Sequence, residues 1–236
     1  MCGVLLPMPQ IDLVKLLCEI EDYVLIKRST IFPDYSSGFD VDLLVMDKNT
    51  AVQKVVDFYE SNFSSKGELR VINKEYHCHI DFLINDKLDI RVDLIHNFDF
   101  FTKFSVKNGF FIKIFKDRQI LDLENGSVHI PAPEDELTIR YFEYLEYFDR
   151  YPNKIKHLDY ICDVNDKSLK KQFFENTHMF INFKRQEWKR GVNISQKPES
   201  MRMALNNIYV NSKYIISASV RKLASRTIKL YRHLRG

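Results

Sequence analysis

The sequence of 236 residues contains no run of roughly 20 apolar residues, the length that a membrane-spanning helix requires. It also lacks a basic N-terminal segment followed by an apolar run, so we recognise no secretory signal. Its four cysteines lie far apart and form no CxxC pair, a spacing that favours reduced thiols. We therefore expect a cytoplasmic globular protein.

Acidic residues are missing from the C-terminal end, where the chain from Ser200 onward has eight Lys and Arg and no Asp or Glu. Residues 1–125 show the opposite balance, with 15 Lys and Arg against 20 Asp and Glu. The formal charge of the whole chain is only +3, so the total conceals this asymmetry. Such an uneven distribution indicates two parts with different roles.

The first half of the chain mixes helix and strand patterns. Apolar residues at three- and four-residue spacing predict helices over 10–21 and 48–63. Apolar runs predict strands over 22–28, 39–46, 68–73, 75–84, 88–96 and 110–115. Asn85, Asp86 and Lys87 are typical of a hairpin turn between two of these strands. These patterns predict a small mixed sheet with helices.

The second half is helical in pattern. Pro131 and Pro133 mark the boundary, and the three acidic residues after them suit the first turn of a helix because of the helix dipole. Helical patterning then covers 133–149, 154–162, 166–182 and a long segment within 199–234. We predict an α+β protein with a mixed-sheet domain over 1–130 and a C-terminal helical bundle over 131–236.

Two aspartates interrupt the apolar segment 39–46. Asp40 and Asp42 are two residues apart, so in a strand both carboxylates point to one face while Val41 and Leu43 point to the other. Neighbouring carboxylates repel each other unless a cation joins them. Magnesium takes hard oxygen ligands and is usually held by one or two carboxylates together with substrate phosphates. A magnesium site is therefore one interpretation, and a strand end with two solvated aspartates is the other.

The stretch 23–46 resembles the signature of the nucleotidyltransferase superfamily, which includes DNA polymerase beta and the aminoglycoside nucleotidyltransferases. That signature is an apolar strand, Gly-Gly or Gly-Ser, a short spacer, Asp-x-Asp and an apolar run. Ser29 falls at the serine position, and Asp40 and Asp42 fall at the paired aspartates. The resemblance covers about the first half of the chain. It implies a divergent nucleotidyltransferase-like domain with Asp40 and Asp42 as catalytic metal ligands.

The family also has a third strand carboxylate, for which the sequence offers two candidates. Asp93 in DIRVDLI fits, and the resemblance implies that it completes a second metal position or takes the proton of the attacking hydroxyl. Asp81 on the neighbouring predicted strand is the rival. The choice depends on the hairpin register, because a slip of one residue would reverse the answer.

The family's glycine position is occupied by Arg28, which departs from the signature. The glycine lets backbone amides approach the nucleotide phosphates. Lys27 and Arg28 can supply positive charge there instead, because arginine binds phosphate well. Ser29 and Thr30 are further candidates for nucleotide binding, although small hydroxyl residues also simply tighten turns.

Two histidines, His77 and His79, alternate with Asp81 on one predicted strand. Histidines bind zinc, but this spacing recurs by chance and no further Cys or His supports it. We expect no zinc site.

The resemblance implies an enzyme that uses Mg²⁺ to transfer a nucleoside monophosphate from a nucleoside triphosphate to an acceptor hydroxyl or phosphate. The acceptor we favour is a small molecule or glycan intermediate, with RNA second because the basic C-terminal residues suit it. Contact with an anionic membrane surface is a less favoured role for those residues. The plain alternative is an amphipathic helix that packs against the rest of the protein and has a solvated basic face. The alternative is a catalytically inactive family member that serves as a binding or scaffold protein, for which Arg28 is the main argument.

Overall fold

The structure is a computed structural model, and it describes residues 11–184 of the chain. These residues form two compact units. The first holds the residues up to Asn97 together with Asp117–Pro131, and the second holds Phe98–Lys116 and the residues from Ala132 onward. The chain therefore enters the second unit, returns to the first and leaves it again. The predicted division into 1–130 and 131–236 stays a prediction, because much of its second segment lies outside the described residues.

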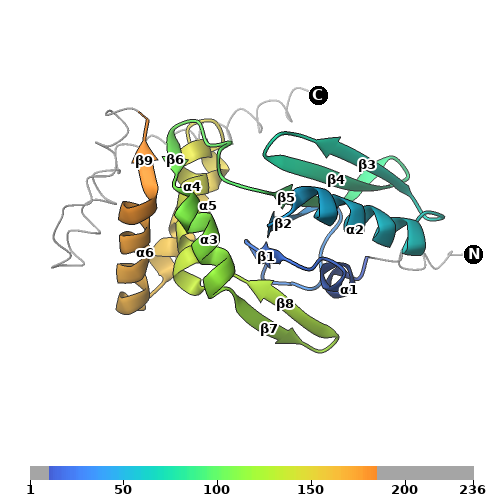
Figure 1. Cartoon of the computed structure of the whole chain (residues 1–236), viewed down its shortest axis with the longest axis horizontal. Coiled ribbons are helices and arrows are strands. Elements are labelled where there is room, and N and C mark those ends of the chain that lie inside the picture. Colours follow the sequence, from blue (N-terminus) through green and yellow to red (C-terminus); the bar gives the residue numbers. More distant parts are fainter. Residues whose placement is uncertain (1–10, 185–236) are drawn as a thin grey trace, which may run out of the picture. The chain divides into compact units, whose positions relative to one another are not determined.

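The first unit is built on a five-stranded sheet in the order β1-β2-β5-β4-β3 (Figure 1). Strands β2 and β5 are parallel, and the other neighbouring strands are antiparallel. The strands span Tyr23–Leu25 (β1), Phe39–Val45 (β2), Glu68–Asn73 (β3), His77–Ile84 (β4) and Lys87–Ile95 (β5). Each overlaps a segment predicted as a strand, and the mixed sheet is confirmed.

Two helices of the first unit, α1 (Leu13–Cys18) and α2 (Lys48–Asn62), begin at aspartate caps. The carboxylate of Asp12 accepts a hydrogen bond from Lys15 N, and that of Asp47 accepts from the amides of the first turn of α2. Such caps satisfy amides that have no partner within the helix and stabilise it by about 1 kcal/mol each. Both helices lie within the ranges predicted from apolar spacing.

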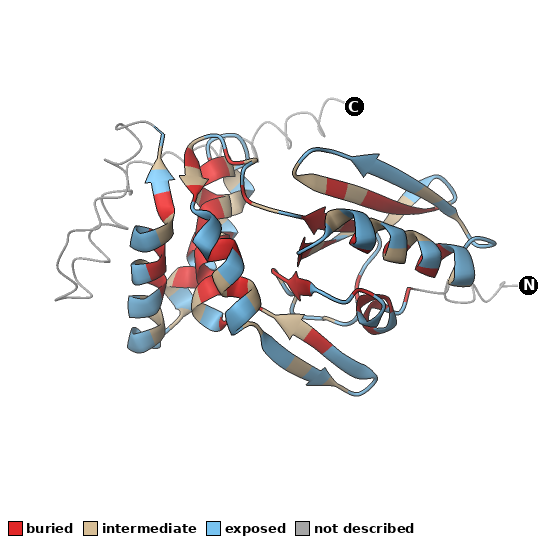
Figure 2. Cartoon of the chain, in the orientation of Figure 1, coloured by how far each residue is buried: buried red, intermediate tan, exposed pale blue. Residues whose placement is uncertain are grey.

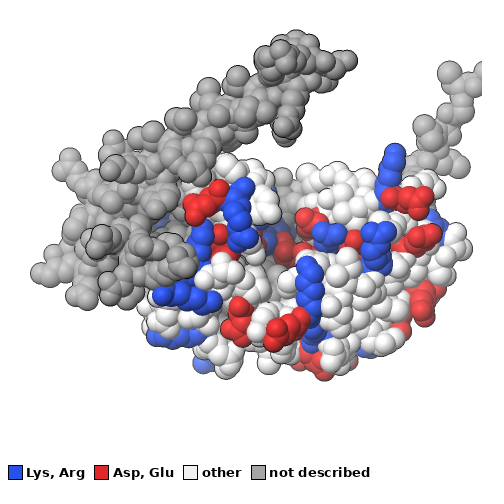
Figure 3. Space-filling view, turned by 90° about the horizontal axis from the view of Figure 1, so that it is seen from above, with Lys and Arg blue, Asp and Glu red and all other residues white. Residues whose placement is uncertain are grey.

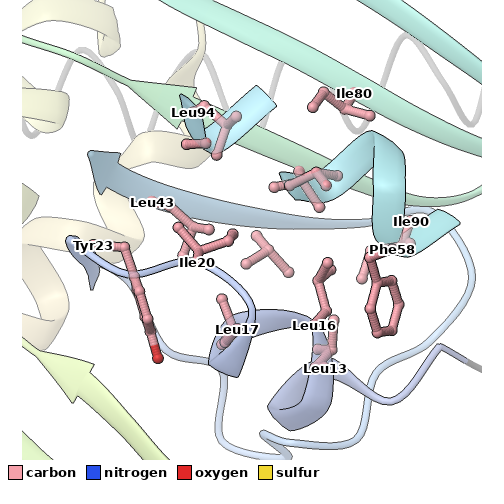
Figure 4. Close-up of a cluster of buried hydrophobic side chains, with 14 of the residues drawn as sticks. Leu13, Leu16, Leu17, Ile20, Tyr23, Leu43, Phe58, Ile80, Ile90 and Leu94 are labelled. Carbon is pink, nitrogen blue, oxygen red and sulfur yellow. The ribbon is translucent and has the colours of Figure 1, made fainter. Parts of the chain in front are cut away.

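The core of this unit lies between the two helices and one face of the sheet. Figure 4 shows Leu13, Leu16 and Leu17 of α1 beside strand residues such as Leu43, and all four are fully or almost fully buried. Helix α2 has buried residues on one side and exposed residues on the other (Figure 2). A fully buried leucine stabilises the fold by roughly 1.5–3 kcal/mol. Because successive side chains of a strand point to opposite faces, the strand residues that alternate with these core residues lie on the other face of the sheet.

The hairpin between β4 and β5 turns through two residues with positive φ, Asn85 (51°) and Asp86 (60°). Asn and Asp tolerate this left-handed backbone better than most residues, which suits a two-residue hairpin turn. The predicted turn is confirmed. The ladder then shifts register at Phe82 and Leu83, because Leu83 pairs with Leu88 whereas Phe82 pairs with Ile90. The residue skipped in β5 is Asp89, as in a β-bulge.

A second hairpin, β7 (Gln119–Leu123) and β8 (Gly126–Ile130), completes the first unit. Its amide at His129 donates to the hydroxyl of Tyr23 on β1 at 3.3 Å. At Gly126 a Cβ atom would lie 3.0 Å from Val14 of α1, so the hairpin approaches the helix closely. The sequence patterns did not indicate the two strands of this hairpin.

In the second unit the predicted strand over 110–115 is wrong, because residues Asn108–Asp117 form helix α3. Its buried side chains are Phe110, Phe111 and Ile114, while Ile112 is exposed. A strand would have buried alternate residues, whereas this pattern follows one side of a helix. A short apolar run does not distinguish the two structures by itself.

The other elements of the second unit are mainly helical. Helix α4 (Pro133–Tyr147) begins at the predicted proline and carries the acidic first turn, and η1 (Pro152–Lys154), α5 (Ile155–Asp163) and α6 (Lys167–Phe180) follow. Strands β6 (Phe104–Val106) and β9 (Ile181–Phe183) pair antiparallel. The chain is thus α+β as predicted, with a mixed sheet followed by helices.

The predicted helix within 199–234 lies outside the described residues. Among residues 11–184 no helix combines the length and the apolar character needed to cross a membrane.

Candidate active site

Strand register brings three aspartates together on the sheet face opposite the core. Asp42 of β2 is the direct partner of Asp93 on the parallel strand β5, and Asp40 is the partner of Arg91. Neighbouring strands lie about 4.8 Å apart, so these side chains are near neighbours. The intervening residues Val41 and Val92 are buried in the core. The paired aspartates predicted from the sequence therefore share one face with Asp93.

The rival carboxylate, Asp81 of β4, lies on the same face but one strand further away. Its two oxygens accept hydrogen bonds from Arg91 Nε at 2.6 Å and Arg91 Nη2 at 2.9 Å. These bonds, which outweigh the effect of burial, lower the pKa of Asp81. Arg91 thus stands between Asp81 and Asp40 in the sheet, and Asp93 is the third carboxylate beside the pair.

The three carboxylates repel one another. Burial, followed by the charges of Asp42 and Asp40, raises the pKa of Asp93 to about 7, against the opposing effect of Arg91 and Lys27. Burial and then the charge of Asp42 also raise the pKa of Asp40. Like charges held close on rigid strands produce this effect, and a bound cation would relieve it.

Lys27 contacts the carboxylate of Asp42 instead of pointing freely into solvent. Its Nζ atom lies 2.7 Å from Asp42 Oδ2, and the two side chains are only 11% and 18% exposed. The backbone places this lysine, because Ile26 N donates to Asp42 O at 3.0 Å just after β1 ends. Lys27, predicted from the sequence to bind nucleotide, is therefore an ion-pair partner of one of the paired aspartates.

His79 of β4 contacts Asp93 from the other side, through its Nδ1 atom and Asp93 Oδ1. Its second ring nitrogen, Nε2, lies 2.9 Å from Lys74 Nζ. An ammonium group can only donate, so Nε2 accepts and the proton of the neutral ring sits on Nδ1, from which it is donated to Asp93. Burial, followed by the charge of Lys74, lowers the pKa of His79 and favours that neutral ring.

The contact between His79 and Asp93 was missed by sequence reasoning, which considered His79 only as a zinc ligand. Its neighbour His77 lies with its ring 4.5 Å from that of His79. Among residues 11–184 no group of three or more His, Cys, Asp or Glu side chains is already placed to hold a metal ion. The one signal for the contact was the hairpin register, which the bulge at Phe82 and Leu83 alters.

The donor chemistry of Asp40, Asp42 and Asp93 nevertheless fits a hard divalent cation. All three supply carboxylate oxygens from adjacent strands, and burial together with their mutual negative charge raises the pKa values of Asp40 and Asp93. In the structure Lys27 and His79 contact two of these carboxylates. Metal binding would therefore require a change of side-chain partners.

The residues predicted to bind nucleotide phosphates follow β1 in a loop. Arg28 and Thr30 are exposed and Ser29 is partly exposed. The Ser29 hydroxyl oxygen is itself buried and has no hydrogen-bond partner within the described part of the chain. These positions lie one or more residues beyond Lys27, which contacts the carboxylates directly.

Among the described residues visible in Figure 3, Lys and Arg side chains are interspersed with Asp and Glu side chains. The basic residues from Ser200 onward, on which an RNA interface was predicted, lie outside the described residues.

No protein-family model and no curated protein matches the sequence. Two solved structures show distant similarity. A crystal structure of JHP933 from Helicobacter pylori is 10% identical over 93% of this chain and 93% of that chain, with a TM-score of 0.32. An antigenic nucleotidyltransferase-like protein from Paracoccidioides brasiliensis is 13% identical over 67% of this chain and 80% of that chain, with a TM-score of 0.31.

Proposed function

We propose that the first unit is a magnesium-dependent nucleotidyltransferase domain. It would transfer a nucleoside monophosphate from a nucleoside triphosphate to an acceptor hydroxyl or phosphate and release pyrophosphate. The observation that carries this proposal is the placement of Asp40, Asp42 and Asp93 on two parallel neighbouring strands, on the face opposite the core. A divalent cation would offset the repulsion between carboxylates crowded in this way, and it can bind nucleotide phosphates at the same time.

Each carboxylate has a distinct part in the proposed reaction. Asp40 and Asp42 would hold Mg²⁺, whose charge stabilises the phosphate oxygens during in-line displacement. Asp93 would bind a second ion or accept the proton of the attacking hydroxyl. In that step the acceptor oxygen forms a bond to the α-phosphorus, the bond from this phosphorus to the bridging oxygen breaks, and pyrophosphate leaves.

The segment after β1 would bind the triphosphate. Lys27 and Arg28 would supply positive charge at the place of the glycine in the nucleotidyltransferase signature. Ser29 and Thr30 would supply hydroxyl groups. The exposed position of Arg28 suits a long side chain that reaches a phosphate from the loop. We favour a small molecule or glycan intermediate as the acceptor, with RNA as the second candidate.

Thermal unfolding with each of the four nucleoside triphosphates, with and without Mg²⁺, tests the proposal. A ligand that binds only the folded protein raises apparent stability, by about 2.7 kcal/mol at 100 times its Kd. We expect one nucleotide to stabilise the protein only when Mg²⁺ is present. Asp42→Asn should abolish this effect, whereas Asp122→Asn, on an exposed position of β7, should retain it.

A second candidate function is that of a binding or scaffold protein without catalysis. The ion pair between Lys27 and Asp42 favours it, because one of the proposed metal ligands already has a cationic partner. A folded wild-type protein that no nucleotide stabilises, with or without Mg²⁺, would support this function and contradict the enzyme.

A further inference from the structure

The ion pair between Lys27 and Asp42 differs from an ordinary surface salt bridge. Nζ and Oδ2 are 2.7 Å apart, and both side chains are largely withdrawn from solvent. Removing charges from water is costly, so such a pair persists only where each charge compensates the other. The ammonium of Lys27 is thus the cation that offsets Asp42 in this structure.

The same carboxylate is a ligand in the proposed magnesium site, and the two cations compete for it. An ammonium at hydrogen-bond distance from Oδ2 and a divalent ion bound to the same carboxylate would lie within a few ångströms of each other. Positive charges that close repel strongly wherever solvent is partly excluded. Binding of a divalent ion at Asp42 therefore requires Lys27 to leave.

No other described cation can take over the role of Lys27 in its present position. Arg91, the neighbour of Asp40 in the sheet, already donates two hydrogen bonds to Asp81. Lys74 contacts His79, and its ammonium is separated from Asp93 by that ring. When Lys27 departs, Arg91 still offsets part of the negative charge of the three aspartates, and an added cation at Asp42 can replace the charge of Lys27.

Lys27 is also built to move without disturbing the sheet. The backbone next to it is held by the hydrogen bond from Ile26 N to Asp42 O, and its side chain is a flexible four-carbon stem. Its neighbours along the chain are Arg28 and Ser29, at the loop proposed to bind phosphate. The proposed move takes the ammonium from the carboxylate toward that loop by a change of side-chain rotamer.

We propose that Lys27 and a divalent cation exchange at Asp42, and that the released ammonium then binds the triphosphate of the nucleotide. This inference rests on the proposed function. Metal alone must break the ion pair, and nucleotide alone can bind Lys27 only by leaving Asp42 without a cation, so each binds weakly without the other. Together they satisfy both groups, and by linkage each raises the affinity for the other by the same factor. Lys27 thereby makes the site selective for the metal–nucleotide complex over either component.

The test compares wild type with Lys27→Met, which keeps an apolar stem and removes the charge. Binding of Mn²⁺ alone, and of the stabilising nucleotide with Mg²⁺, is measured by titration calorimetry. We expect the variant to bind Mn²⁺ alone about tenfold more tightly and the nucleotide complex about tenfold more weakly, within the usual range of coupling between sites. Lys87→Met, at an exposed position at the start of β5, is the matched control and should change neither affinity.

The two affinities separate the possible outcomes. If the nucleotide complex binds Lys27→Met more weakly while Mn²⁺ binds as in wild type, Lys27 is a phosphate ligand only and the exchange is refuted. Unchanged nucleotide affinity also refutes it. If wild type binds neither Mn²⁺ nor any nucleotide, the proposed function itself fails. Should Lys27→Met unfold, Lys27→Gln, which keeps a hydrogen-bond donor for Asp42, is measured with the same expected directions.

Discussion

Buried carboxylates occur in both units, and they differ in the charges around them. In the second unit Asp135 is fully buried, accepts hydrogen bonds from Lys113 at 2.7 and 2.9 Å, and accepts another from Asn176 at 2.8 Å. In the first unit Asp93 has one hydrogen-bonding neighbour, His79, and two aspartates close by. The negative charge of Asp135 is offset by Lys113, whereas Asp93 lies beside further negative charges.

The pKa values alone do not reveal this difference. The pKa of Asp135 is about 6 because burial raises it and Lys113 opposes the rise, whereas that of Asp93 is about 7 because burial and the charges of Asp42 and Asp40 all raise it. The sign of the neighbouring charges distinguishes a structural carboxylate from a candidate ligand site. Carboxylates whose negative charge the fold does not compensate are candidate ligands for an external cation.

The largest effect should come from Glu146 on α4, a structural carboxylate of the second unit. It is 1% exposed and accepts hydrogen bonds from Thr102 N at 2.9 Å, Thr102 Oγ1 at 2.5 Å and Lys103 N at 3.0 Å. Glu146→Ala leaves these donors without an acceptor, so we expect a loss of about 3 kcal/mol in the free energy of unfolding. Urea unfolding measures it.

If Glu146 is structural, Glu146→Ala should retain the magnesium-dependent stabilisation by nucleotide at a temperature where it is folded. If Glu146→Ala lowered the free energy of unfolding by less than 0.5 kcal/mol, which is about the effect of an ordinary surface substitution, the structural role of Glu146 would be contradicted.

Asp93→Asn should raise the free energy of unfolding, and by less than Glu146→Ala lowers it. With a pKa near 7 in the folded protein and 3.8 as the ordinary value, Asp93 ionises first in the unfolded chain. Wild type therefore loses stability as pH rises from about 4 to 7, and the loss is complete above pH 7. The Asn variant escapes this loss of about 4 kcal/mol but gives up the hydrogen bond between His79 and a charged carboxylate, so we expect it to be more stable than wild type by about 1–2 kcal/mol at pH 8.

Urea unfolding of Asp93→Asn and wild type at pH 5 and pH 8 checks the sign. The difference between the two proteins should be larger at pH 8. An equal difference at both values would show that the charge of Asp93 is not destabilising.

The smallest effect should come from His79, which holds the carboxylate of Asp93 in place. His79→Asn offers an amide N–H near the position of Nδ1, whereas His79→Leu offers none. We expect the leucine variant to lose up to about 1 kcal/mol of the magnesium-dependent stabilisation by nucleotide, and the asparagine variant to retain most of it. Thermal shifts compare them, and equal losses in both variants would argue against positioning through this hydrogen bond.

The fold class followed from local patterns in the sequence, and the main error has a local cause. The strands over 68–73 and 75–84 were predictable from apolar and β-branched residues, and α2 from apolar spacing with an aspartate before it. Helix α3 was mistaken for a strand because Phe110–Phe115 is too short and too apolar for its period to be read. The pairing of β6 with β9 joins residues far apart in sequence, which no local pattern encodes.

The site was predictable only in part. Asp40 and Asp42 follow from the two-residue period of a strand. The choice of Asp93 over Asp81 depends on the parallel pairing of β2 with β5, which places Asp93 opposite Asp42. The partner of Asp93 in the hairpin depends on the bulge at Phe82 and Leu83, because a continuous ladder from the turn would have paired Asp93 with Cys78. A bulge shifts the register by one residue without leaving a clear sequence signal.

Crystals grown with Mn²⁺ and a non-hydrolysable analogue of the stabilising nucleotide test the central claim most directly. Anomalous scattering locates the ion. We predict it at about 2.1 Å from carboxylate oxygens of Asp40 and Asp42, close to the distance typical of magnesium, with Lys27 Nζ moved from Asp42 to a phosphate oxygen. A nucleotide bound elsewhere, with no ion at these aspartates and Lys27 still on Asp42, would contradict both the proposed function and the exchange.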